Sequence, residues 1–371
     1  MAKKSDRKVF VVKIGTSVLA DDSGGIDAKV VESIAEQVAR AKKRGMAAVI
    51  VSSGAVLVGM QLLRLAKRPE YLPEIQACAA VGQARMVGIY DEQFKKLGVM
   101  TAQVLLTQDD VNDRARYLNA RNTFLTLLKK GVVPIVNEND TVSTEEIKFG
   151  DNDRLSGLVA NLIEADRLVI MSNVDALYRF DKKDKTKKEP IYKVDKITEE
   201  IESLADDEYS RFGVGGMRTK LQAAKMTTNA GIECILINGK RGSALIDALD
   251  GKGAGTVFAA NQPKIRAKKR WIAYSSRTIG VVKVDSGARE VLAKKNRSLL
   301  PSGVIACSGR FNIGDAVSVV GEDGKEFARG IANYSSSELN KIKGRNTGDI
   351  EKILGYKYYD EVIHRDNLVI L

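Results

Sequence analysis

Apolar runs and amphipathic stretches alternate along the first 260 residues. Continuous apolar or β-branched runs, with Lys13 as a polar exception, occupy residues 9–14, 47–51, 99–106, 132–136, 168–171 and 234–237. Runs of this length predict strands that are buried on both faces of a sheet. Apolar positions at helical spacing predict helices between them, over 27–44, 75–97, 113–130, 154–165 and 217–230. This alternation predicts an α/β domain, a mostly parallel sheet sandwiched by helices.

The pattern changes after residue 260. A charged run at 264–270 follows a glycine-rich segment, and short strand-like runs then lie at 280–284, 303–307, 316–320 and 325–331. The step Glu322-Asp323-Gly324 between the last two runs predicts a hairpin, and helices are expected over 288–295 and 336–343. We therefore expect a first domain over 1–260, a linker over 261–276 and a small β-rich domain over 277–371.

Composition narrows the possible chemistry. The chain has 371 residues, three widely spaced cysteines and a single histidine, His364. These counts argue against a disulfide framework, a zinc site and a histidine-based catalytic triad. No apolar stretch is long enough for a membrane span, and the basic start of the chain lacks the apolar core of a signal peptide. We expect a cytoplasmic protein that does not contact a membrane.

The charge is unevenly distributed. The formal net charge is +12, and residues 263–371 contribute +8 of it, with 20 lysines and arginines against 12 acidic residues. A basic C-terminal segment of this kind is compatible with RNA binding, which we keep as an alternative function for the second domain. The other interpretation is that the excess charge serves solubility.

Polar turns follow four of the expected strands. They begin at Lys13, Ser52, Asn137 and Ser172, and two of them contain a glycine, Gly15 or Gly54. In an open parallel sheet, ligands bind outside the carboxyl ends of the strands, so these turns are expected to meet at one edge. Lys13 either binds an anion there or extends its ammonium group to water. Gly15 and Gly54 either let backbone N–H groups approach a ligand or only form a turn.

Two further segments precede helices. In Gly150-Asp151-Asn152-Asp153 the polar side chains either cap a helix or belong to a ligand site that binds an ammonium group, orients lysines or holds Mg²⁺. The other segment is glycine-rich and enters a helix, an arrangement that binds phosphate unless it is only a flexible loop. It reads Gly213-Val214-Gly215-Gly216-Met217-Arg218-Thr219-Lys220. Lys13 and Lys220, without a histidine base, suit phosphoryl transfer.

These motifs together resemble the glutamate 5-kinase family. The resemblance rests on Lys13-Ile-Gly-Thr-Ser, Ser52-Ser53-Gly54-Ala55, Asn137-Glu-Asn-Asp140, Gly150-Asp-Asn-Asp153 and Gly215-Gly-Met-x-Thr-Lys220, and it covers nearly the whole chain. It implies an amino acid kinase fold followed by a PUA-like domain, the latter through Leu299-Leu300-Pro301, Gly314-Asp315 and Gly330. It also implies the reaction of ATP with L-glutamate, with Mg²⁺, to give γ-glutamyl phosphate, the first step of proline synthesis from glutamate.

The resemblance implies a role for each matching residue. Lys13 and Lys220 would stabilise the transferring phosphoryl group, and Asp153 would hold both lysines in position. Glutamate would be bound by Ser53, Gly54, Asp140, Asp151 and Asn152. ATP would be bound by Lys13, Gly15, Ser172, Asn173, Val214, Gly215, Gly216, Met217, Arg218, Thr219 and Lys220. Ser172-Asn173 departs from the Thr-Asp that is typical of the family, and asparagine in place of aspartate removes a charge but keeps an acceptor.

The resemblance also implies partners, and it leaves a nearer alternative. The family is inhibited by proline, forms homo-oligomers, here a dimer or tetramer, and supplies its product to a glutamyl phosphate reductase. A different amino acid kinase, acting on N-acetylglutamate or aspartate, would share part of these motifs. The PUA-like tail argues against that alternative.

Overall fold

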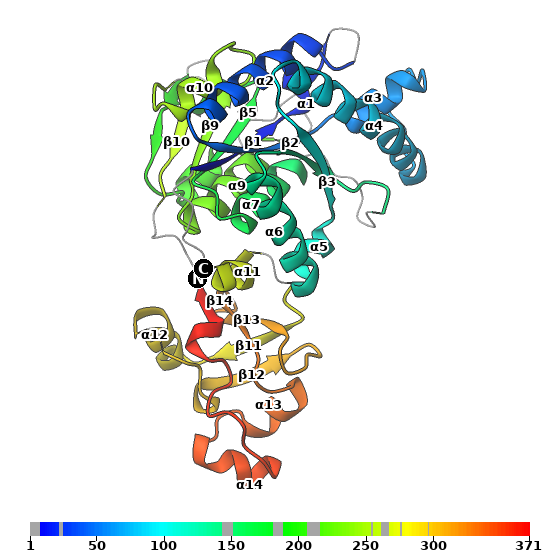
Figure 1. Cartoon of the computed structure of the whole chain (residues 1–371). Coiled ribbons are helices and arrows are strands. Elements are labelled where there is room, and N and C mark those ends of the chain that lie inside the picture. The colour runs from blue at the N-terminus through cyan, green and yellow to red at the C-terminus, as the bar shows by residue number, and fades with distance from the viewer. Residues whose placement is uncertain are drawn as a thin grey trace. The chain divides into compact units, whose positions relative to one another are not determined.

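A computed structural model describes residues 8–21, 25–142, 151–180, 188–205, 216–253, 255–260, 267–274, 277–295 and 297–371 (Figure 1). The chain divides into two compact units. The first comprises residues 1–111 and 115–264, and the second comprises residues 112–114 and 265–371.

An eight-stranded sheet forms the centre of the first unit, in the order β3-β4-β2-β1-β5-β9-β10-β8. Its strands are β1 (Val9–Ile14), β2 (Ala47–Ser52), β3 (Thr101–Leu106), β4 (Val133–Glu138), β5 (Arg167–Ser172), β8 (Lys193–Val194), β9 (Glu233–Asn238) and β10 (Thr256–Phe258). Neighbouring strands run parallel except for β9 and β10, which pair antiparallel. The predicted mostly parallel α/β sheet is therefore confirmed.

Helices cover both faces of this sheet (Figure 1). The helices of the first unit are α1 (Thr16–Leu19), α2 (Ala28–Lys43), α3 (Ala55–Leu62), α4 (Leu72–Lys96), α5 (Gln108–Asn112), α6 (Arg114–Lys129), α7 (Asp151–Leu162), α8 (Glu199–Ser203), α9 (Met217–Asn229) and α10 (Ala244–Leu249). A small hairpin of β6 (Leu177–Phe180) and β7 (Lys188–Ile191) lies outside the main sheet. It flanks the charged segment 181–187, which lies outside the described residues. Across the described parts of the chain, no helix is both long and apolar enough to span a membrane.

The two faces of β1 have different surroundings. Phe10, Val12 and Ile14 belong to an apolar core that also contains residues of α2 and α10. Side chains alternate across a strand, so Lys13 points to the opposite face. Figure 1 shows α7 and α9 on that face, away from α2 and α10. The sheet therefore places a lysine in its middle and points it toward two helices.

Helices α3 and α4 are in direct backbone contact. A Cβ atom added to Gly59 would lie 1.8 Å from the carbonyl oxygen of Cys78, and one added to Gly82 would lie 1.8 Å from that of Ala55. No larger residue fits either position without moving a helix. Gly54, immediately before α3, has φ +106°, a left-handed conformation that favours glycine. The turn after β2 and the position of α4 are thus fixed by three glycines.

The second unit contains a separate five-stranded sheet in the order β12-β11-β13-β14-β15. Its strands are β11 (Gly280–Val284), β12 (Val304–Ser308), β13 (Ala316–Val320), β14 (Glu326–Ile331) and β15 (Leu368–Ile370). The predicted hairpin is confirmed, because β13 and β14 pair antiparallel around residues 322–324. This unit has its own apolar core, which includes Val282, Val319 and Leu339.

Helices in the second unit are α11 (Ala267–Tyr274), α12 (Ser286–Lys295), α13 (Ser336–Ile342) and α14 (Ile350–Leu354), with short 3₁₀ turns at Pro301–Gly303, Thr347–Asp349 and Arg365–Asn367. Helix α11 occupies part of the span 261–276 that was expected to be a linker. It packs on the sheet of this unit, where Arg329 Nη1 donates a hydrogen bond of 3.1 Å to the carbonyl oxygen of Ala273.

Candidate active site

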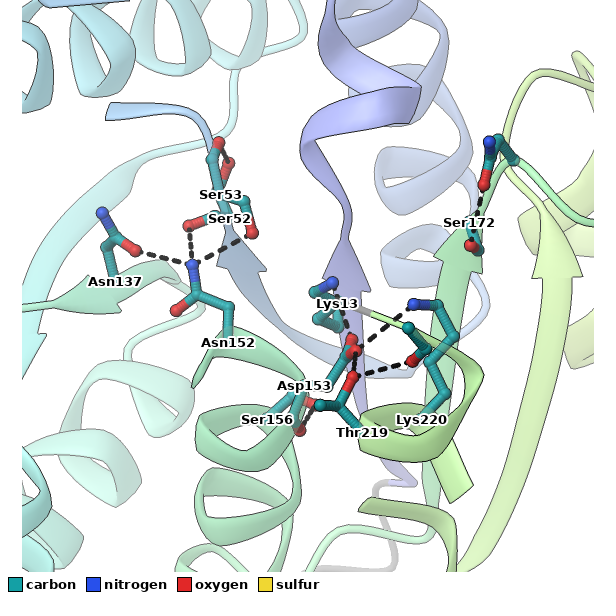
Figure 2. Close-up of polar contacts among 12 residues, drawn as sticks. Lys13, Ser52, Ser53, Asn137, Asn152, Asp153, Ser156, Ser172, Thr219 and Lys220 are labelled. Carbon is teal, nitrogen blue, oxygen red and sulfur yellow. Dashed lines mark hydrogen bonds and ion pairs between the residues drawn. The ribbon is translucent and has the colours of Figure 1, made fainter. Parts of the chain in front are cut away.

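A buried carboxylate joins two lysines from different parts of the chain. Asp153, in the first turn of α7, lies with its Oδ1 2.6 Å from Lys13 Nζ on β1 and its Oδ2 3.4 Å from Lys220 Nζ on α9. Thr219 Oγ1 donates a third contact to Asp153 Oδ2 at 2.7 Å. Figure 2 shows these side chains converging between the end of β1 and the start of α9. The sequence motifs at 13, 153 and 219–220 therefore meet in one cluster.

This cluster is almost inaccessible to water. Asp153 is 0% exposed, Lys13 is 5% exposed and Lys220 is 8% exposed. Burial alone would raise the pKa of Asp153, but the charges of Lys13 and Lys220, with hydrogen bonds from Lys13 and Thr219, outweigh it and lower the pKa. The carboxylate is ionised at neutral pH. Two ammonium groups against one carboxylate leave a net positive charge, which suits an anionic ligand.

The position of Lys13 follows from the strand that carries it. Lys13 lies opposite Val51 of β2 and Ile170 of β5, in the interior of the sheet. It does not carry its ammonium group out to water, because that group is paired with the buried Asp153. An unpaired ammonium group in this environment would cost several kcal/mol, so Asp153 is what allows a cation here.

Beside this cluster lies a second one, made of amides and hydroxyls. Asn152 Nδ2 lies within hydrogen-bond distance of three acceptors: Asn137 Oδ1 at 2.9 Å, Ser53 Oγ at 3.0 Å and the carbonyl oxygen of Ser52 at 3.1 Å (Figure 2). Asn137 Nδ2 in turn donates to Gln83 Oε1 at 2.8 Å. Because Asn152 and Asp153 are consecutive residues, α7 holds the two clusters next to each other.

Fewer contacts are described for the residues that were predicted to bind ATP. Ser172 Oγ lies 3.4 Å from Asn173 Oδ1 just after β5. The N–H group of Gly15 donates to the carbonyl oxygen of Met171 at 3.1 Å, so it is already used within the protein. Gly216 immediately precedes α9, and a Cβ atom there would meet no atom of the described residues within 4 Å. That open space is compatible with a ligand at the start of the helix.

The structure describes only some of the other predicted site residues. Met217 is buried and Arg218 is exposed, in the first turn of α9. Val214 and Gly215 lie outside the described residues, as does the side chain of Asp151, whose backbone begins α7. Asp140 is half-buried and acts electrostatically on Arg68, whose pKa is lowered mainly by burial and raised in part by this carboxylate.

Sequence reasoning missed Gln83 and Arg68. Gln83 is 9% exposed on α4 and joins the amide cluster. Arg68 precedes Pro69 between α3 and α4. Neither residue lies in a motif at a strand end, so only the packing of α4 against the sheet brings Gln83 to the site.

Comparison with known proteins defines the class first. The amino acid kinase family model matches residues 8–238, and the PUA domain model matches residues 280–354. The first unit also resembles the solved structure of carbamate kinase from Giardia lamblia bound to AMP-PNP. That likeness has a TM-score of 0.52 at 18% identity and covers 69% of this chain and 99% of that chain, which supports the fold alone. The class is an amino acid kinase with a PUA domain.

Full-length relatives identify the family within this class. The glutamate 5-kinase of Caldanaerobacter subterraneus is 46% identical over 98% of this chain and 97% of its own length. The glutamate 5-kinase of Geobacter sp. strain M21 is 46% identical over the whole of both chains. The chain belongs to the glutamate 5-kinase family, as its motifs predicted.

Proposed function

We propose that this protein transfers the γ-phosphoryl group of ATP to the γ-carboxylate of L-glutamate, as the first step of proline synthesis from glutamate. The family supports the reaction, and the observation that carries the proposal is the buried cluster of Lys13, Asp153 and Lys220. Its net positive charge lies at the edge of the sheet where ligands of such folds bind.

The reaction needs alignment and charge neutralisation more than proton transfer. A γ-carboxylate oxygen forms a bond to the γ-phosphorus of ATP, and the bond from that phosphorus to the β,γ-bridging oxygen breaks, which leaves ADP. A side-chain carboxyl with a pKa of about 4.3 is already ionised at neutral pH, so no base is required. This agrees with a chain that has one histidine, near its C-terminus.

The two lysines stabilise the negative charge on the transferring phosphoryl group and on the departing ADP. Asp153 holds their ammonium groups in position. The start of α9, with Gly216 and the segment before it, binds phosphate oxygens through backbone N–H groups. Ser53, Asp140 and Asn152 bind glutamate, and the left-handed Gly54 keeps the turn beside Ser53 free of a side chain.

Mg²⁺ accompanies ATP in this proposal. Among the described residues, no group of three or more His, Cys, Asp or Glu side chains is placed to hold a metal ion. Mg²⁺ in kinases is bound largely by phosphates and water with one or two carboxylates. The ion neutralises phosphate charge when it is bound.

The decisive experiment measures γ-glutamyl hydroxamate formed from ATP, Mg²⁺, hydroxylamine and L-glutamate. N-Acetylglutamate and aspartate serve as alternative substrates. The key variant is Lys220→Met, which keeps the bulk of the side chain and removes its charge. We expect kcat to fall about 10²- to 10³-fold, the usual effect of removing one group that stabilises transition-state charge.

Lys225→Met is the matched control, because Lys225 is exposed on the same helix and pairs with Glu202. It should leave kcat unchanged. Folded wild-type protein that forms no product from glutamate would refute the proposed reaction. Full activity in Lys220→Met would keep the reaction and remove Lys220 from it.

The family further supports a cytoplasmic homo-oligomer, inhibited by proline, whose acyl phosphate product is consumed by a reductase. An acyl phosphate hydrolyses readily, so the next reaction in the sequence must capture it quickly. Insensitivity of the hydroxamate assay to millimolar proline would refute the inhibition. RNA binding by residues 277–371 remains the alternative function of the second unit, and its affinity would fall steeply with salt.

A further inference from the structure

A line of side-chain amides crosses the candidate site from α4 to α7. Gln83 Oε1 accepts from Asn137 Nδ2 at 2.8 Å, and Asn137 Oδ1 accepts from Asn152 Nδ2 at 2.9 Å. We call Gln83, Asn137 and Asn152 the amide relay. Its members come from a helix, a strand and a second helix, and none of them lies next to another in the sequence.

Two atoms at the ends of the relay have no partner among the residues that the structure describes. They are Gln83 Nε2 and Asn152 Oδ1, both buried. A buried polar atom without a hydrogen bond is unfavourable, and in a native protein it indicates a ligand or a water molecule that completes it. Asn152 Oδ1 is an acceptor, so its missing partner is a donor.

The relay and the carbonyl oxygen of Ser52 together fix which end of Asn152 faces outward. Each side-chain amide has one acceptor oxygen and one donor nitrogen. Because Gln83 offers its oxygen, Asn137 must turn its nitrogen toward Gln83 and its oxygen toward Asn152. Asn152 must then turn its nitrogen inward, where Ser53 Oγ at 3.0 Å and the carbonyl oxygen of Ser52 at 3.1 Å also accept. The oxygen of Asn152 is left for the ligand.

We propose that Gln83 is a positioning residue that sets Asn152 Oδ1 as an acceptor for the α-ammonium group of the substrate. This inference rests on the proposed function. The two carboxylates of glutamate carry no donor, so its ammonium group is the partner that an acceptor selects. The relay thus favours an amino acid over the same dicarboxylate without the amino group, which is glutarate.

The test compares the binding of L-glutamate and glutarate by titration calorimetry, together with KM and kcat for glutamate. Gln83→Met keeps the volume and removes the acceptor, whereas Gln83→Glu keeps an acceptor for Asn137. We expect wild type to bind glutamate at least about tenfold more tightly than glutarate. In Gln83→Met this ratio should fall roughly tenfold, and KM for glutamate should change more than kcat. Gln83→Glu should keep the preference within about threefold.

Gln93→Met is the matched control. Gln93 is also buried on α4, at 8% exposed, and bonds Lys96 instead of the relay, so its loss should not change the preference. If Gln83→Met does not fold, Asn137→Asp replaces it. An aspartate still accepts from Asn152, so the glutamate preference should survive.

Three results would overturn the relay: equal binding of both ligands by wild type, a preference that Gln83→Met retains, or a preference that Asn137→Asp loses. Each of these concerns ligand selectivity in a folded protein. A wild type without glutamate-dependent ATP turnover would instead refute the proposed function, so the two failures are distinguishable.

Discussion

At the residue scale, the most constrained group is Asp153. Its carboxylate lies between two nearly buried lysines, and it is itself completely buried. A buried ion pair adds little net stability compared with apolar packing, but removal of one partner leaves uncompensated charge. We therefore expect Asp153 to contribute to the stability of the fold as well as to the orientation of the lysines.

We expect Asp153→Asn to lower the free energy of unfolding by about 3–5 kcal/mol, because the buried ammonium group of Lys13 then loses the carboxylate that it is paired with. Urea unfolding of wild type and variant measures this difference. Asp250→Asn is the control, since Asp250 forms an exposed pair with Arg44, and its loss should cost at most about 1 kcal/mol.

The difference in free energy of unfolding between wild type and Asp153→Asn should depend on pH in a defined way. The pKa of Asp153 is lowered in the folded protein, so its stabilising contribution is complete above the unfolded pKa of about 3.9 and is lost as the pH falls through the folded value. The difference between wild type and Asp153→Asn should stay constant from pH 8 to about pH 5. A difference that already shrinks between pH 7 and pH 6 would contradict this assignment.

At the element scale, the backbone contact between α3 and α4 determines where Gln83 lies. Gly59 and Gly82 leave no room for a Cβ atom between these helices. Gly82 immediately precedes Gln83, and α3 follows the turn that contains Ser53. Any separation of the helices therefore moves opposite sides of the amide cluster apart.

We expect Gly59→Ala to destabilise the protein by about 1–3 kcal/mol through overpacking and to raise KM for glutamate more than KM for ATP. Gly88→Ala, in the same α4, is the matched control. A Cβ atom there meets no described atom within 4 Å, so alanine should stabilise the helix by about 0.5–1 kcal/mol. Thermal unfolding and initial rates of both variants test this. Equal effects of the two substitutions would refute the packing argument.

The elements also show what the sequence could predict. β1, β11 and β13 have the predicted bounds, because their apolar runs end at polar or turn residues. α7 begins at Asp151, three residues before the prediction, because Asp151-Asn152-Asp153 form its first turn. β8 and β10, of two and three residues, were not predicted, since so short a segment carries no periodic pattern.

The same limit applies to the candidate site. Lys13, Asp153 and Lys220 could be identified because each lies in a motif at a strand end or a helix start. Gln83 could not, because a glutamine on a helix looks like any solvent-facing residue. Its partner Asn137 is 54 residues away in sequence, and no local pattern encodes such a contact.

At the scale of the whole molecule, the two units have separate apolar cores and separate sheets. All described side chains of the lysine cluster and the amide relay belong to the first unit. Helix α11 packs on the sheet of the second unit, so a boundary before residue 267 leaves both sheets intact.

We expect a fragment of residues 1–260 to fold and to keep glutamate-dependent ATP consumption within roughly tenfold of the full chain, since domains with their own core fold alone. Cooperative urea unfolding and the hydroxamate assay measure this. A folded fragment without activity would show that the second unit contributes to catalysis. The proline inhibition of fragment and full chain, measured side by side, would locate that property.

The alternation of side chains along β1 constrains how this gene can change over time. Loss of a single codon between those for Val9 and Lys13 would shift the strand by one position and turn the lysine toward the apolar core. Replacement of Val11 by isoleucine leaves that parity intact. Substitutions of one apolar residue for another in this strand are therefore tolerated, whereas a deletion or insertion of one residue before Lys13 is not.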